Sequence, residues 1–165
     1  MKSLRGKVTI RTATEHDLAE IQRLHLALCE NERKYVPDEN MNFTFSEEGK
    51  RYFLNRISSP NAIVHVVDYQ KKLAGFVIGS MDEKKKSWAK FESVYIDPVL
   101  RGRGLGKKLI DEFINWAHKK NADPITVAVA DGNPAYEVYI RSGFKVTERK
   151  GKTIVLALPR KKLED

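Results

Sequence analysis

The sequence is poor in cysteine and in long apolar runs. Its 165 residues include one cysteine, Cys29. A single thiol excludes an intrachain disulfide and a metal site made of cysteines alone, and it is typical of a reducing compartment. No apolar run approaches the length of a membrane span, and residues 1–10 lack the apolar core of a signal peptide. We therefore expect a cytoplasmic protein without membrane contacts.

Metal-binding patterns are also lacking. His25 and His118 lie within helical patterns and are interpreted as ordinary helix residues. We therefore expect no metal cofactor.

What the sequence has in excess is positive charge. It contains 30 Lys and Arg against 22 Asp and Glu, a net charge of +8, with 41% hydrophobic residues. Such a balance favours an anionic partner, which could be a nucleic acid, an acidic protein or a phosphorylated cofactor. The length fits one domain, residues 1–165, with room for a substantial core.

Hydrophobic periodicity predicts eleven elements. Thr14 and Asp17 resemble a capping box, and Ser46 is a second helix cap. The predicted strands cover residues 7–11, 62–69, 73–81, 88–96, 125–130 and two in 144–158; the predicted helices begin near residues 14, 46, 104 and 133. The order β-α-α-β-β-β-α-β-α-β-β predicts a single α/β domain, a mixed central sheet with helices on both faces.

Residues 97–109, DPVLRGRGLGKKL, place a glycine-rich basic turn between a strand and a helix. The first amides of a helix lack internal partners and carry partial positive charge, so this turn favours a phosphate or pyrophosphate. A Walker loop does not match, because Lys108 stands where Ser or Thr is required. A dinucleotide fingerprint does not match either, because Lys107 replaces its third glycine. A tight helix entry without ligand is the alternative.

The turn does match R-x-x-G-x-G, with Arg101, Gly104 and Gly106. This pattern resembles the pyrophosphate-binding motif of the GNAT superfamily, the acyl-CoA-dependent N-acetyltransferases. Residues 91–98, FESVYIDP, resemble the fourth strand of that family, and residues 135–144, AYEVYIRSGF, resemble its second motif. The predicted element order is similar over nearly the whole chain.

The resemblance implies that acetyl-CoA is the cosubstrate and that an amine attacks it directly in a ternary complex. It implies that the cofactor contacts the backbone of one strand, the glycine turn and the start of the last helix. These residues are Val94, Tyr95, Ile96, Arg101, Gly102, Arg103, Gly104, Leu105, Gly106, Lys107, Asn133 and Ala135. One position departs from the family: Gly132 stands where an asparagine is frequent, and Asn133 follows one place later.

The resemblance also implies two catalytic residues. Tyr139 corresponds to the tyrosine that gives a proton to the CoA sulfur, and Glu92 to a base that works through water. The alternatives are a core aromatic residue, with Tyr136 as the rival donor, and a carboxylate paired with Lys or Arg across strands.

Residues 29–49 carry six acids and two bases, a local charge of −4. The acids are Glu30, Glu32, Asp38, Glu39, Glu47 and Glu48. Because the family usually builds its acceptor wall here, we expect a cationic acceptor, such as a polyamine, an aminoglycoside, a lysine or an N-terminal amine, in contact with Glu30 and Glu32. A solvated helical surface is the alternative.

Two other functions remain open at the level of the sequence. One is a non-catalytic nucleic-acid-binding domain, which the net charge suggests and the lack of a recognisable motif disfavours. The other is a CoA-binding GNAT domain without activity. A homodimer is compatible with the sequence.

Overall fold

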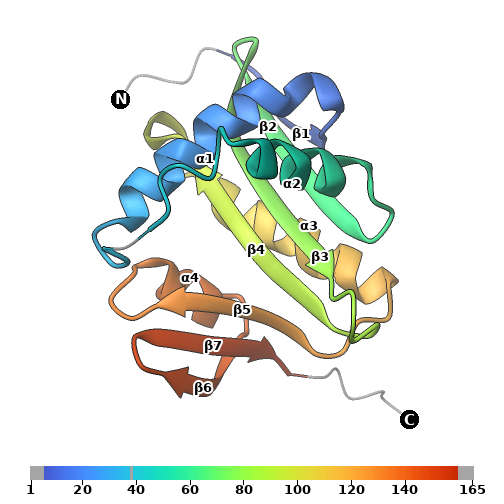
Figure 1. Cartoon of the computed structure of the whole chain (residues 1–165), viewed down its shortest axis with the longest axis vertical. Helices are drawn as coiled ribbons and strands as arrows, with labels where there is room; N and C mark the ends of the chain where they lie inside the picture. Colours follow the sequence, from blue (N-terminus) through green and yellow to red (C-terminus); the bar gives the residue numbers. More distant parts are fainter. Residues whose placement is uncertain (1–5, 38, 160–165) are drawn as a thin grey trace.

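The computed structural model describes residues 6–37 and 39–159 of the chain. Within these ranges, seven strands and four α-helices follow the predicted order (Figure 1). The strands are β1 (Val8–Thr12), β2 (Ala62–Tyr69), β3 (Lys72–Met81), β4 (Ala89–Ile96), β5 (Ile125–Ala130), β6 (Lys145–Lys150) and β7 (Thr153–Leu158). The α-helices are α1 (Leu18–Glu32), α2 (Glu47–Ser58), α3 (Leu105–Lys119) and α4 (Ala135–Arg141). Asp38, one of the six acids counted above, lies outside the described residues.

The strands form one mixed sheet in the order β1-β2-β3-β4-β5-β7-β6. Neighbours are antiparallel except β4 and β5, which run parallel. A parallel pair needs a crossover, and α3 supplies it. The mixed α/β fold with helices on both faces is therefore as predicted.

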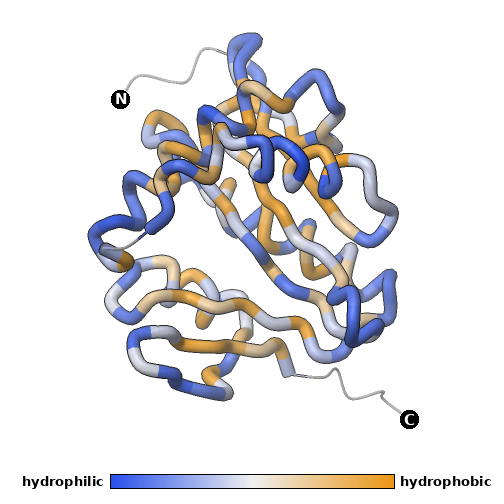
Figure 2. The backbone as a smooth tube through the Cα atoms, in the orientation of Figure 1, coloured by the Kyte–Doolittle hydropathy of each residue, from blue (hydrophilic) through white to orange (hydrophobic). Residues whose placement is uncertain are grey.

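Each face of the sheet has its own apolar cluster. Figure 1 shows α1 and α2 in front of the sheet and α3 behind it, and in Figure 2 the hydrophobic stretches follow the central strands. The cluster under α1 and α2 contains Ile21, Leu24, Leu28, Phe53, Val66, Phe76 and Ile78. The cluster under α3 and α4 contains Val77, Phe91, Leu109, Ile110, Phe113, Val127 and Tyr139.

The predicted helix start at Thr14 is a single 3₁₀ turn, η1 (Glu15–Asp17), which leads directly into α1. The Thr14 backbone N–H donates to the Asp17 carboxylate at 2.8 Å, and Arg11 of β1 binds both oxygens of that carboxylate at 2.8 Å. The cap therefore also ties the start of α1 to the edge of the sheet. The Ser46 hydroxyl accepts the Gly49 N–H at 3.0 Å and caps α2 as expected.

The parallel pair separates after a short stretch. Residues 89–91 of β4 pair with residues 125–127 of β5, and beyond them the two strands diverge (Figure 1). On its other edge, β4 carries a bulge: Phe91 lies opposite Gly79 and Ser93 opposite Ile78, so Glu92 has no partner on β3. A bulge bends its strand and redirects side chains at this point.

Candidate functional site

A cavity of about 670 Å³ lies where β4 and β5 diverge. This size is within the range of small-molecule and cofactor sites. We call it the cleft. It brings together nine of the residues singled out in the sequence: Glu32, Glu92, Val94, Tyr95, Ile96, Arg101, Asn133, Ala135 and Tyr139.

The glycine turn follows the diverging end of β4, after the 3₁₀ turn η2 (Pro98–Leu100). Gly102 and Gly104 have φ of +80° and +77°, a region that favours glycine, and Gly104 is the N-cap of α3. A Cβ added at Gly102, Gly104 or Gly106 would meet nothing within 4 Å, so the space in front of these amides is open. The turn has the geometry of an anion site at a helix N-terminus.

Some side chains of the turn are charged and exposed, and others are held against the rest of the fold. Arg103 and Lys107 are exposed, and Lys107 forms an ion pair with Asp111 at 3.0 Å. The Arg101 guanidinium donates to the Ile96 carbonyl at 2.9 Å, which holds it at the end of β4. Leu105 is buried in the core, so only its backbone can serve a ligand.

Tyr139 enters the cleft from α4. Its ring packs edge-on against Phe91 and Phe144, at centroid distances of 5.5 and 6.1 Å, and it is 6% exposed. Burial raises the pKa of Tyr139 above the usual value of a phenol, and the negative charge of Glu32 adds to the rise. The phenol is therefore protonated at neutral pH. The rival Tyr136 lines a different cavity, of about 310 Å³.

The start of α4 is organised by Asn133. Its side-chain oxygen accepts the Ala135 N–H at 3.0 Å, which satisfies one of the free amides of this short helix. Asn133 thus lines the cleft with a side chain that already has a structural partner.

Glu92 faces α2. Its two carboxylate oxygens accept hydrogen bonds from Nε and Nη2 of Arg56 at 2.8 and 2.9 Å. The same guanidinium lies over the Tyr52 ring, 4.7 Å from its centroid. Arg56 is not among the predicted site residues, although the four-residue spacing of Tyr52 and Arg56 indicates that they share one face of α2.

The last turn of α1 supplies the acidic wall. Glu32 is part-buried and lines the cleft beside Tyr35, whereas Glu30 is exposed and is not among the lining residues. Burial, and then the negative charge of Glu39, raise the pKa of Glu32 to about 7. The cleft thus holds one carboxyl group that changes its charge near neutral pH.

The segment between α1 and α2 is anchored by Thr44, which is fully buried. His25 Nδ1 lies 2.8 Å from the Thr44 hydroxyl, and the Gln22 side chain donates to the Thr44 carbonyl at 3.1 Å. Burial lowers the pKa of His25 to about 4. These contacts fix the segment against α1, two to three turns before Glu32.

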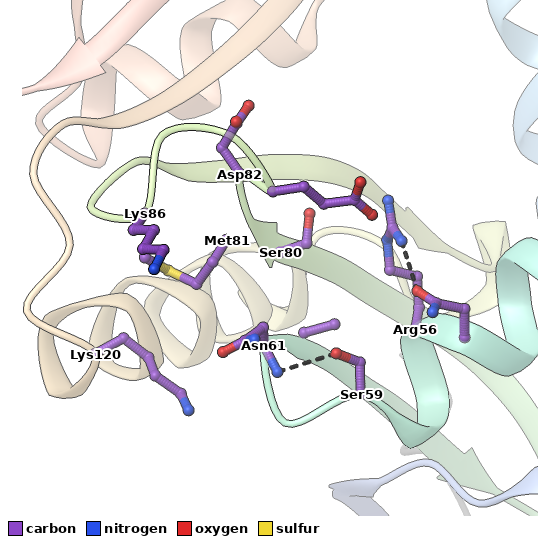
Figure 3. Close-up of a pocket in the computed structure, with 11 residues that line it drawn as sticks. Arg56, Ser59, Asn61, Ser80, Met81, Asp82, Lys86 and Lys120 are labelled. Carbon is purple, nitrogen blue, oxygen red and sulfur yellow. Dashed lines mark hydrogen bonds between the residues drawn. The ribbon is translucent and has the colours of Figure 1, made fainter.

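A second cavity, of about 510 Å³, lies beside the end of α2 and the turn between β3 and β4 (Figure 3). Figure 3 shows Arg56, Asp82 and Lys86 around it. Because Arg56 lines this cavity and Glu92 lines the cleft, their ion pair stands between the two spaces.

Over residues 6–37 and 39–159, no group of three or more His, Cys, Asp or Glu side chains is arranged to hold a metal ion. In the same residues, no helix has both the length and the apolar character needed to cross a membrane.

Known proteins match this chain in sequence over most of its length. The model of the acetyltransferase (GNAT) family matches residues 24–144. An uncharacterized N-acetyltransferase of Methanocaldococcus jannaschii is 27% identical over 145 residues, which make up 85% of this chain and 62% of that protein. The chain therefore spans less than two thirds of the length of this relative.

Two solved structures share the fold. The PaiA N-acetyltransferase of Thermoplasma acidophilum in complex with coenzyme A matches with a TM-score of 0.78 and 18% identity, over 93% of this chain and 99% of that one. The yncA protein of Salmonella typhimurium, solved with its cofactor acetyl-CoA, matches with a TM-score of 0.73 and 20% identity, over 96% and 98%. The predicted fold is confirmed by these matches.

Proposed function

The chain belongs to the acetyltransferase (GNAT) family, and from this premise we propose that it transfers an acetyl group from acetyl-CoA to a primary amine in a ternary complex. The cleft between the diverging strands carries the proposal, because its lining extends from Arg101, at the start of the glycine turn, to the buried phenol of Tyr139. The CoA and acetyl-CoA of the two solved relatives support the choice of cosubstrate.

Acetyl-CoA supplies an acetyl group activated as a thioester. The edge of β4 beyond Phe91 is free of β5, so the backbone of Val94, Tyr95 and Ile96 can bind an extended pantetheine arm in place of a strand. The open space before Gly102, Gly104 and Gly106 accepts the pyrophosphate, whose charge Arg103 and Lys107 balance. Asn133 and Ala135 border the same arm where they line the cleft.

The chemistry requires a neutral amine, a polarised thioester and a proton for the leaving sulfur. Tyr139 is the donor to the sulfur, because its hydroxyl is protonated at neutral pH and its ring is fixed between Phe91 and Phe144. Glu92, expected as the base, stays a prediction. Its ion pair with Arg56 supports a second role, which is to close the inner end of the cleft with fixed polar groups.

The acceptor class follows from the charge of the cleft. Glu32 lines it and Glu39 lies within electrostatic reach of Glu32, so a cationic amine is attracted to the wall formed by α1. Of the two expected acceptor contacts, Glu32 lines the cleft, whereas Glu30 is exposed and is not among the lining residues.

An amine-panel assay tests the function. Acetyl-CoA is incubated with spermidine, an aminoglycoside, a lysine-containing peptide and a peptide that begins with alanine, and thiol release is measured. We expect release above the hydrolytic background with at least one amine. Release with none of them, from protein that binds acetyl-CoA in calorimetry, would support the inactive CoA-binding alternative.

A further inference from the structure

We propose that the Glu32 carboxylate is the catalytic base that takes a proton from the incoming ammonium group. The inference rests on the proposed function and adds a catalytic residue to it. Glu32 lies at the end of α1 and lines the same cleft as Tyr139. The two groups interact electrostatically across the cleft, since the carboxylate charge acts on the phenol.

Glu32 has the protonation behaviour that a base requires. An ordinary amine has a pKa near 10.4 and is protonated at neutral pH, so it must lose a proton before it attacks. Burial and Glu39 bring the pKa of Glu32 to about 7, so about half of the molecules carry the carboxylate at pH 7. This carboxylate is a stronger base than an ordinary glutamate, because burial and Glu39 raise its pKa.

Glu92 is less suited to this step for a geometric reason. Both of its oxygens already accept hydrogen bonds from Arg56. The guanidinium also repels an approaching ammonium group. Among the described residues, Glu32 has neither a hydrogen bond nor an ion pair from its side chain, so its oxygens are available to the acceptor.

The other titratable groups near Glu32 act in known directions. Burial and then the charge of Glu39 raise the pKa of Glu32, and burial raises the pKa of Tyr139 and of Cys29, with the Glu32 charge adding to both rises. Arg101 also lines the cleft, held at the far end of β4 by the Ile96 carbonyl.

The reaction can be written with every proton accounted for by Glu32, Tyr139 and water. The ammonium gives one proton to Glu32, and the neutral nitrogen attacks the thioester carbon to form the C–N bond as the C–S bond breaks. The sulfur receives a proton from Tyr139 as it leaves, and the second proton, which the nitrogen loses as the amide forms, restores the phenol. One proton is released to water per turnover, through Glu32. Once Glu32 is neutral, the charge that raised the pKa of Tyr139 is gone, and the phenol donates more readily.

The first test measures Glu32 directly. Carboxyl carbon NMR of protein labelled at glutamate follows the titration, and Glu32→Gln identifies the signal. We expect a midpoint near pH 7, which Glu39→Gln moves to lower pH because the repulsive charge is removed. A midpoint below pH 5 in the wild type overturns the proposal.

The second test measures rates with the acceptor from the panel that releases most thiol. We expect the wild-type kcat to rise with pH through about 7, and Glu32→Gln to lose this limb and about 10²- to 10⁴-fold in kcat. Glu15→Gln, which removes an exposed charge on η1 outside the cleft lining, is the matched control and keeps both the wild-type kcat and the pH limb. Acetyl-CoA affinity is expected to stay unchanged in all three proteins.

The kinetic results distinguish a Glu32 that acts as a base from a Glu32 that only attracts the cationic acceptor. A higher KM with unchanged kcat and an intact pH limb in Glu32→Gln means that Glu32 only attracts the cation, and overturns the proposal. Loss of the limb in Glu92→Gln but not in Glu32→Gln assigns the base to Glu92. If the wild type acetylates no amine, the proposed function itself fails and the base role falls with it, whereas the NMR midpoint still reports the charge state of Glu32.

Discussion

At the scale of single residues, the two tyrosines of α4 occupy different surroundings although they are one turn apart. Tyr139 is buried in the cleft, and Tyr136 lines a separate cavity. Tyr139→Phe keeps the ring between Phe91 and Phe144 and removes the hydroxyl that we propose as the proton donor. We expect kcat to fall by about 10²- to 10⁴-fold, with acetyl-CoA affinity nearly unchanged, in steady-state kinetics and calorimetry.

Tyr136→Phe is the control for this substitution, because it removes a hydroxyl from the same helix outside the cleft. A larger loss in Tyr136→Phe would assign the acid to the other tyrosine. A kcat within a factor of roughly three of the wild type in Tyr139→Phe would mean that the thiolate leaves without this donor.

His25 makes the stability of the fold depend on pH. Its pKa is about 4 in the folded protein and about 6.5 in the unfolded chain, because burial disfavours the charged ring. The unfolded state therefore binds the proton more readily, and stability is lost as pH falls from 6.5 to 4. The loss from this residue is about 3 kcal/mol, since each pKa unit corresponds to roughly 1.4 kcal/mol.

Urea unfolding at pH 7 and pH 4.5 measures this effect against His25→Gln, which can still bond to Thr44 but does not titrate. We expect the wild type to lose more free energy of unfolding than the variant over this interval. Equal losses would show that the ring accepts its proton without penalty in the folded state.

At the scale of elements, Gly104 in the turn before α3 has to adopt a positive φ and, in the proposed function, to leave room for a phosphate. Gly104 has positive φ, so any other residue there costs roughly 1–2 kcal/mol of backbone strain. Gly104→Gln and Gly104→Glu share this strain and nearly the same volume, and they differ by one negative charge. We expect Gly104→Glu to bind acetyl-CoA at least about tenfold more weakly, or roughly 1.4 kcal/mol, in calorimetry.

Equal affinities of the two variants would argue against a phosphate at this turn. Thermal unfolding of both, without ligand, checks that they share the same strain. A difference in stability between them would point to a local contact of the new side chain instead.

The order of elements could be predicted because its signals are local. Ser46 caps a helix within three residues, and two apolar runs separated by a short polar turn mark β2 and β3. The Arg56–Glu92 pair could not be predicted, because its partners are 36 residues apart and belong to a helix and a strand. The position of Tyr139 followed from its distance to Gly143 and Phe144, whereas the environment of Glu32 depends on a segment without periodicity.

At the scale of the whole molecule, the net charge of +8 is compatible with two anionic partners, acetyl-CoA and a nucleic acid. Binding measurements with each of them distinguish the two. Acetyl-CoA at 100 times its Kd is expected to stabilise the protein by about 2.7 kcal/mol, which raises Tm by about 5–10 °C for a chain of this size. Thermal unfolding with and without acetyl-CoA measures it.

The control is a short duplex RNA at the same molar concentration as acetyl-CoA and at physiological salt. We expect little change in Tm with this RNA. The reverse pattern, with RNA binding that weakens steeply as salt rises and no response to acetyl-CoA, would support the basic-domain alternative.

The divergence of β4 and β5 also has a mechanical consequence. Three residue pairs form the hydrogen-bonded joint between a four-stranded plate, β1 to β4, and a three-stranded plate, β5, β7 and β6. Phe91 of β4 contacts Tyr139 of α4, the helix that connects β5 to β6, so this ring contact crosses the same joint. If the proposed role of Tyr139 holds, we expect the rigidity of this joint to affect how the phenol is aligned with β4. We expect Phe91→Leu to loosen the position of the Tyr139 ring and to lower kcat, although the substitution changes no polar group.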